Sequence, residues 1–186
     1  MKKLFEYGGI GASIVLIALG VGSVVVGFDG RDRVRSDLAR EKIVGTPDSP
    51  IPGQRVDTGS EAEDFAATMR KHTLEATGGR TYAEMGRFLD KKGKETNDEK
   101  LAAKDPKTGQ PVPNGQRDIW VTSTALSTAL HTSYFAESVS TWAIVMGFAM
   151  LLTGVGFLVL TLRLLRQPTR AAREARPHNA PAAVPS

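Results

Sequence analysis

The sequence predicts an all-α membrane protein: a two-helix transmembrane hairpin whose helices extend outward, with a small helical extracytoplasmic cap. Two apolar runs support this fold class, since no Asp, Glu, Lys or Arg occurs over residues 7–28 or over residues 138–162. At 1.5 Å per helical residue, each run is long enough to cross a hydrocarbon core of about 30 Å. The third observation is that capping patterns and helix-like apolar spacing recur between the two runs.

Composition and charge exclude several classes of function. The chain has 186 residues, a net charge of +4 and no cysteine. Residues 29–140 hold 17 Lys and Arg against 18 Asp and Glu, whereas residues 163–186 hold five Arg against one Glu. The basic character therefore belongs to the tail, and we expect no nucleic acid as a partner. The lack of cysteine excludes disulfides, thiolate metal sites, iron–sulfur clusters, lipoprotein anchors and cysteine nucleophiles.

The charges that flank the apolar runs predict how the chain crosses the bilayer. We expect a short cytoplasmic N-terminus at residues 1–7, a first transmembrane helix at 8–28 and a second at 140–162. Lys2 and Lys3 precede the first helix, and an arginine-rich tail follows the second. Because Lys and Arg close to a span favour the cytoplasmic side, the N-terminus and the C-terminus are both expected to be cytoplasmic, in a bacterial plasma membrane.

The first run also allows a second interpretation, in which it is a cleaved signal peptide. Ala18 and Gly20 supply small residues at the spacing of a cleavage site. The apolar run continues without a break to Phe28, which favours a retained anchor. In either case the region between the runs faces outward.

Small residues recur along one face of the first transmembrane helix, which favours close approach of another helix. The helix-packing residues predicted from this stripe are Gly9, Ser13, Gly20, Ser23 and Gly27. Two interpretations remain open. The stripe packs against the second span of the same chain, or it docks a partner membrane protein or a second copy.

The extracytoplasmic helical region is expected over residues 29–139. In chain order it comprises a stalk helix to 44, a Pro-rich loop at 45–59, helices at 60–76 and 81–92, a polar loop at 93–116 and a stalk helix at 117–139. Ser60 and Thr81 each begin a capping-box pattern that is completed three residues later by Glu63 and Glu84. Residues 45–118 contain only 11 large apolar side chains, so the small helices are expected to pack on the stalks.

A cytoplasmic Arg-rich and Pro/Ala-rich tail is expected over residues 163–186. Its arginines recur at helical spacing and serve either as a topology anchor or as a binding face for anionic lipid headgroups. These residues are Arg163, Arg166, Arg170, Arg173 and Arg176.

The sequence offers little that points to catalysis. The histidines are His72, His131 and His178, and no convergent ligands or positioned base accompany them. We therefore expect no catalytic residue, no metal site and no cofactor. Trp120 and Tyr134 are candidates for the walls of a ligand cleft on the second stalk.

Two segments resemble a group of uncharacterised actinobacterial two-span membrane proteins. They are Arg40–Asp48 (REKIVGTPD) and Trp120–Ser133 (WVTSTALSTALHTS), and the resemblance covers most of residues 5–165. Some members carry an automatic label of aromatic ring-opening dioxygenase. That chemistry needs a non-haem iron held by clustered His and carboxylate ligands, whereas His72 and His131 are expected on separate helices.

These observations lead to a functional expectation. We expect a non-enzymatic integral membrane accessory or assembly protein that presents a small extracytoplasmic helical domain to a membrane-protein partner or a second copy. The alternative is an extracytoplasmic ligand-binding or sensor module for a lipid or cell-envelope component.

Overall fold

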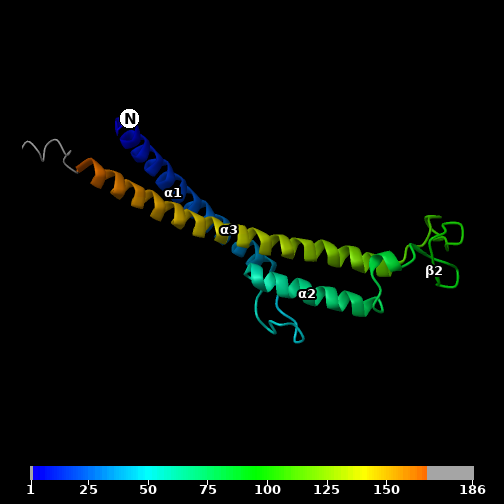
Figure 1. Ribbon diagram of the computed structural model, residues 1–186. Helices are drawn as coiled ribbons and strands as arrows, with labels where there is room; N and C mark the ends of the chain where they lie inside the picture. The colour runs from blue at the N-terminus through cyan, green and yellow to red at the C-terminus, as the bar shows by residue number, and fades with distance from the viewer. Residues whose placement is uncertain (1, 167–186) are drawn as a thin grey trace, which may run out of the picture. The chain divides into compact units, whose positions relative to one another are not determined.

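The computed structural model describes residues 2–166, most of which are helical (Figure 1). Helix α1 spans Lys2–Glu41, α2 spans Gly59–Ala76 and α3 spans Gly115–Arg166. Between α2 and α3 lie a 3-10 turn at Tyr82–Glu84 and the short strands β1, Phe88–Leu89, and β2, Glu95–Thr96. By length and composition, α1 and α3 are apolar enough to cross a membrane.

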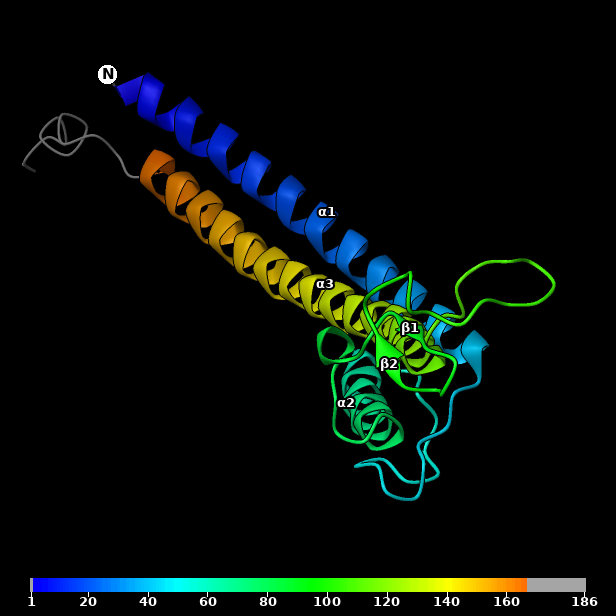
Figure 2. The same ribbon diagram turned by 90° about the vertical axis from the view of Figure 1, so that its right-hand side faces the viewer.

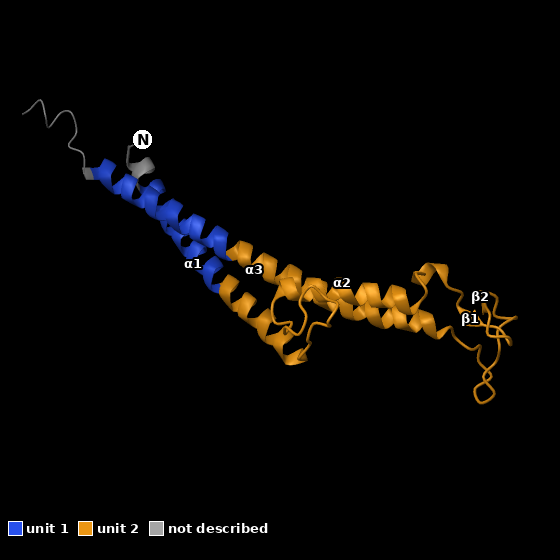
Figure 3. Ribbon diagram, turned by 90° about the horizontal axis from the view of Figure 1, so that it is seen from below, with its two compact units in different colours: residues 1–25, 144–186 blue, residues 26–143 orange. Residues whose placement is uncertain are grey.

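The chain divides into two units, and each is considered by itself (Figure 3). The first contains residues 1–25 and 144–186, and the second contains residues 26–143. Both α1 and α3 are unbroken helices that contribute to each unit. Each helix therefore contains an apolar run and a more polar segment, which follows the run in α1 and precedes it in α3.

Glycines determine how α1 and α3 pack in the first unit. A Cβ atom added to Gly20 would lie 2.8 Å from the carbonyl oxygen of Gly147, and one added to Gly147 would lie 2.8 Å from the carbonyl oxygen of Gly20. A Cβ atom on Gly154 would lie 2.8 Å from the Ile17 side chain, and one on Gly9 would lie 2.8 Å from Thr161 Oγ1. The predicted small-residue stripe thus contacts α3 of its own chain.

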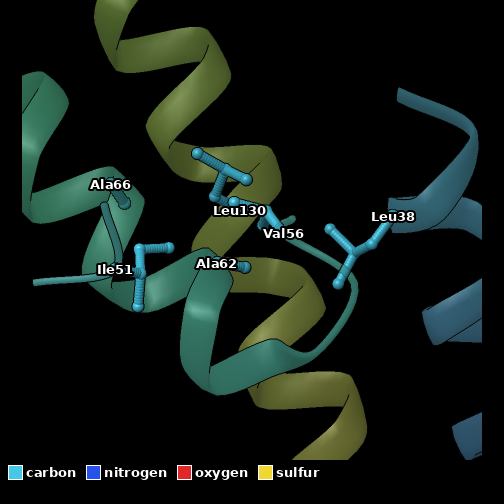
Figure 4. Close-up of a cluster of buried hydrophobic side chains, with 6 residues drawn as sticks. All are labelled: Leu38, Ile51, Val56, Ala62, Ala66 and Leu130. Atoms are coloured by element: carbon cyan, nitrogen blue, oxygen red, sulfur yellow. The ribbon is translucent and has the colours of Figure 1, made fainter. Parts of the chain in front are cut away.

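The second unit has a small hydrophobic core between α1, α2 and α3 (Figure 4). Leu38 of α1 and Leu130 of α3 pack with the first two turns of α2 and with the segment that links α1 to α2. The buried members are Leu38, Ile51, Val56, Ala62, Ala66 and Leu130. As expected for so few large apolar residues, α2 uses the two longer helices as its packing surface.

The link between α1 and α2 folds back on itself to bring two apolar residues into this core. Lys42, at a φ of 55°, follows the last residue of α1, so the helix ends at Glu41 and not at residue 44 as predicted. The Val56 N–H then donates to the Ile43 carbonyl at 3.0 Å. A Cβ atom at position 45 would overlap the backbone of Ile51, so only glycine fits there.

Helix α2 begins with a capping box, although not the predicted one. Thr58 accepts a hydrogen bond from the Glu61 N–H, and the Glu61 carboxylate accepts from the Thr58 N–H at 2.9 Å. The pattern at Ser60 and Glu63 lies two residues further along the chain and is not used. The helix itself, Gly59–Ala76, agrees closely with the prediction of 60–76.

The predicted helix at 81–92 is wrong. Thr81 and Glu84 do form a capping box, but it closes only the 3-10 turn, and β1 begins at Phe88. Gly86 lies so close to β2 that an added Cβ would be 2.8 Å from the Thr96 N. The capping pattern is therefore real, but after it the chain continues as a pair of short strands and not as a helix.

The polar loop predicted at 93–116 contains a short strand and isolated bridges, and α3 begins within it at Gly115. Strand β2 pairs antiparallel with β1, as Figure 2 shows, and isolated bridges connect Asp90 to Ala102 and Lys104 to Pro111. Alternating backbone hydrogen bonds, such as Ala103 N–H to Leu89 O at 2.8 Å, satisfy the polar backbone without a large apolar core.

Candidate functional site

A buried carboxylate and its three hydrogen-bond donors form a cluster in the second unit, here called the Glu137 clamp: Glu137 of α3, Arg31 and Arg35 of α1, and Gly59 of α2. Glu137 is only 8% exposed. Its Oε1 accepts from Arg35 Nε at 2.7 Å and from Arg31 Nε at 3.3 Å, while its Oε2 accepts from the Gly59 N–H at 2.5 Å. One carboxylate therefore joins all three helices of the unit.

The electrostatics of the clamp favour the ionised carboxylate. Burial alone raises the pKa of Glu137, but the Gly59 N–H and the two arginines outweigh it, and the pKa lies below its ordinary value. The Gly59 N–H belongs to the first turn of α2, where the helix dipole also favours a negative charge. These three donors to Glu137 belong to α1 and α2. The carboxylate of α3 therefore links the three helices to one another.

The clamp was not predicted from the sequence. Glu137 lies immediately before the second apolar run, and Arg31 and Arg35 lie among acidic neighbours. The one available signal was the 18-residue uncharged segment before Glu137, which leaves this carboxylate as the single acidic residue between Asp118 and Glu174.

An open groove of about 570 Å³, here called the α2–α3 groove, lies between α2 and the first two turns of α3. Apolar atoms of Met69, Ala76 and Ile119 line it, together with the hydroxyl residues Thr73 and Thr122. Its remaining lining residues are His72, Gly115, Asp118 and Ser123. The groove is wide enough for an apolar chain, and its lining also carries hydroxyl groups.

His72 stands at the edge of this groove and has a structural partner. Its Nε2 lies 2.9 Å from Asp48 Oδ2, to which Lys71 Nζ also donates at 2.8 Å. The Lys71 and His72 hydrogen bonds hold the pKa of Asp48 well below its usual range. The three side chains connect α2 to the link that precedes it.

His131 lines a different cavity, of about 350 Å³, here called the Trp120 groove. The two histidines are thus not brought into one pocket, and His178 lies outside the described residues. Within residues 2–166, no group of three or more His, Cys, Asp or Glu side chains is arranged to hold a metal ion. The described part of the chain accordingly offers no ligand set for the iron that the dioxygenase label requires.

The structure does not bring the predicted cleft residues together. Trp120 is 7% exposed, and its indole N–H donates to the Arg80 carbonyl at 2.9 Å. Tyr134 lies 14 residues later, about 21 Å along α3, with its backbone against Gly59. Trp120 lines the Trp120 groove, whereas Tyr134 lines neither that groove nor the α2–α3 groove.

A second polar cluster fixes the β1–β2 region to the start of α3. Arg80 donates to Glu95 Oε2 at 2.8 Å and to Gln116 Oε1 at 2.7 Å, and Asn114 donates to Glu95 Oε1 at 3.0 Å. These contacts span up to 36 residues of sequence, so no local motif announced them. They hold a mostly polar segment in place where apolar burial is small.

The predicted arginine anchor is described only at its start. Arg163 is exposed on α3, and Arg166 is the last residue of that helix. Arg170, Arg173 and Arg176 lie outside the described residues. The anchor for anionic lipids stays a prediction.

Comparison with known proteins adds no further constraint. No protein-family model, curated protein or solved structure matches this chain. The resemblance to actinobacterial two-span membrane proteins stays a prediction. Its two segments fall at the end of α1 with the following link and in the part of α3 that lines both grooves.

Proposed function

We propose that this protein is a non-enzymatic accessory or assembly subunit of a bacterial plasma membrane. In this proposal α1 and α3 cross the bilayer as a hairpin, both termini are cytoplasmic and residues 29–139 form an extracytoplasmic helical cap. The observation that carries the proposal is the Glu137 clamp, which fixes α2 to the polar extensions of both apolar helices. A cap held this firmly suits the presentation of a surface to a partner.

The hydrogen bonds that reactive side chains make within the protein support a non-enzymatic function. Glu137 is engaged by three donors, and Asp48 is engaged by Lys71 and His72. The Thr73 hydroxyl donates to the Met69 carbonyl at 2.7 Å, and its oxygen lies 2.6 Å from the Ser123 hydroxyl, which can donate to it. Catalysis needs a nucleophile or base aimed at a substrate, whereas these groups point at structural partners.

The topology can be tested by single-cysteine labelling, since the natural chain has no cysteine. We expect Lys100→Cys, at an exposed position that follows β2, to react with a membrane-impermeant maleimide on intact cells. Lys3→Cys should react only after the membrane is permeabilised. The reverse pattern, or labelling of both variants on intact cells, would contradict the proposed orientation.

The α2–α3 groove favours a second candidate function, an extracytoplasmic module that binds a lipid or envelope component through an acyl chain. Its volume of about 570 Å³ and its apolar lining are appropriate to such a chain. Ala76→Trp would fill the groove from an exposed position of α2. A fluorescent fatty acid should bind the natural protein saturably and the variant at least severalfold more weakly; equal binding by both would exclude the groove as the site.

A further inference from the structure

Helix α3 has an unusual surface outside its membrane-spanning part. No Asp, Glu, Lys or Arg occurs over residues 119–136, although α3 exposes much of its surface there. Exposed side chains form a line along this part of the helix, here called the uncharged stripe. It consists of Val121, Ala125, Thr128, Thr132, Phe135 and Val139.

The stripe is apolar in character. Val121, Phe135 and Val139 are 56%, 67% and 50% exposed. The Thr128 hydroxyl donates to the Thr124 carbonyl at 2.8 Å, and the Thr132 hydroxyl donates to the Thr128 carbonyl at 2.7 Å. Since each hydroxyl is satisfied within its own helix, the threonines add methyl groups to the stripe and need no further polar partner.

The spacing of the stripe is that of a helix-pairing seam. Successive members are 4, 3, 4, 3 and 4 residues apart, which is a repeat of 3.5 residues. Two helices that carry such a seam can wind around each other and remain in contact along their length. The side chains of α3 that pack within its own unit, including Trp120, Leu130 and Glu137, lie on other faces.

Lipid does not cover this face, because charged residues of α1 lie at the same level. Within the second unit, a Cβ atom on Gly30 would lie 2.8 Å from Ser140 Oγ, and Arg31 and Arg35 both reach Glu137. At this level and beyond, α1 exposes the charged side chains of Asp32, Arg33, Asp37 and Arg40. Charges of this density belong in water and not in hydrocarbon. The neighbouring face of α3 is therefore in water unless protein covers it.

We propose that the uncharged stripe of α3 is the contact surface for a second copy of this chain. The inference rests on the proposed function, which makes residues 29–139 extracytoplasmic. Two copies with the same membrane orientation meet with their α3 helices parallel, and a seam of this spacing allows parallel helices to stay in contact along their length. At a two-fold axis each residue of one copy approaches the same residue of the other copy. A charged residue there would repel its counterpart, so a surface without charged residues favours contact between two copies.

The size of the stripe is consistent with this partner. It covers 19 positions, from Val121 to Val139, or about 28 Å of helix. Pairing two such faces buries on the order of 1,000 Å² in total, the lower end for specific interfaces. The centre of the stripe has small side chains, which allow the two helices to approach closely: Ala125, Thr128 and Thr132. Larger apolar side chains lie toward its ends: Val121, Phe135 and Val139.

The test compares two alanines in the full chain in its native membrane. Ala125 lies on the stripe, Ala129 lies about 80° from the axis of the stripe around the helix, and both are exposed. Each is changed to cysteine, and copper phenanthroline is used to oxidise intact membranes. We expect Ala125→Cys to give severalfold more disulfide-linked dimer than Ala129→Cys, and Thr128→Glu in the Ala125→Cys background to remove that excess.

The outcomes separate this inference from the proposed function. Equal crosslinking of the two cysteines, or crosslinking unaffected by Thr128→Glu, overturns the second copy as the partner. Protection of Ala125→Cys from an impermeant maleimide without any dimer also overturns it, since another protein then covers the stripe. If Ala129→Cys reacts with that maleimide only in permeabilised cells, the proposed topology fails whatever the crosslinking shows.

Discussion

The Glu137 clamp makes a quantitative prediction about the stability of the second unit. In Glu137→Gln the side chain keeps its size and an acceptor for the Gly59 N–H, but it loses the charge that pairs with Arg31 and Arg35. Breaking a fully buried ion pair costs about 3–5 kcal/mol. The two arginine side chains are 35% and 39% exposed, so solvent screening reduces the expected cost to about 1–3 kcal/mol.

Thermal unfolding in mild detergent can measure this cost through the fluorescence of Trp120, which is buried in the same unit. A Trp142→Phe background leaves Trp120 as the sole indole. For a unit of this size, a loss of 1–3 kcal/mol lowers Tm by roughly 4–15 °C. Glu99→Gln, the same change at an exposed carboxylate, should shift Tm by less than about 2 °C.

The pH dependence gives an independent check with a defined sign. The pKa of Glu137 is lower in the folded protein than its ordinary value of 4.5, so the unfolded state binds its proton first as the pH falls. The stability from this group is therefore present above about pH 4.5 and is lost as the pH falls through the folded pKa. Glu137→Gln should weaken this acid-dependent loss. A variant with the same Tm and the same acid profile as the natural chain would refute the role of the clamp.

Two further predictions concern helix packing and helix capping. Gly20→Leu should destabilise the pairing of α1 with α3 in the first unit by about 1–3 kcal/mol, because the backbone of Gly147 leaves no room for a side chain there. Gly22→Leu, at a position with open space around it, should not destabilise the pairing. Lower resistance of Gly20→Leu to SDS-induced unfolding measures this, and equal resistance of the two variants would contradict it. Thr58→Ala should cost about 1 kcal/mol by removing the α2 cap, while Ser60→Ala should cost less than half of that. Urea titration of Trp120 fluorescence decides between them, and a larger effect at Ser60 would show that the cap lies there instead.

Much of the helical architecture could be predicted from local pattern. The two uncharged runs predicted long apolar helices, which are present in α1 and α3, because charge depletion over more than 20 residues is a strong signal. Helix α2 was predicted to within one residue at its start, even though its cap was assigned to Ser60 and not to Thr58.

The remaining features depend on contacts that no local pattern contains. The 81–92 segment has a capping box and apolar residues at helical spacing. Phe88 and Leu89 nevertheless pair with residues 95–96, and Leu89 also forms backbone hydrogen bonds with residues 103 and 112. Glu137 meets its arginines across more than 100 residues of sequence. The sequence also does not reveal what the small-residue stripe of α1 contacts. The close approach of Gly20 to Gly147 of α3, which lies far away in the sequence, shows that the stripe packs within the chain.

Limited proteolysis of spheroplasts tests the central claim most directly, with a different epitope tag on each terminus. If the chain crosses the bilayer twice with residues 29–139 outside, added trypsin should cut within that segment, which contains 17 Lys and Arg, and both tags should be retained on membrane-bound fragments. Loss of both tags, with the segment between the two apolar helices left intact, would contradict the account.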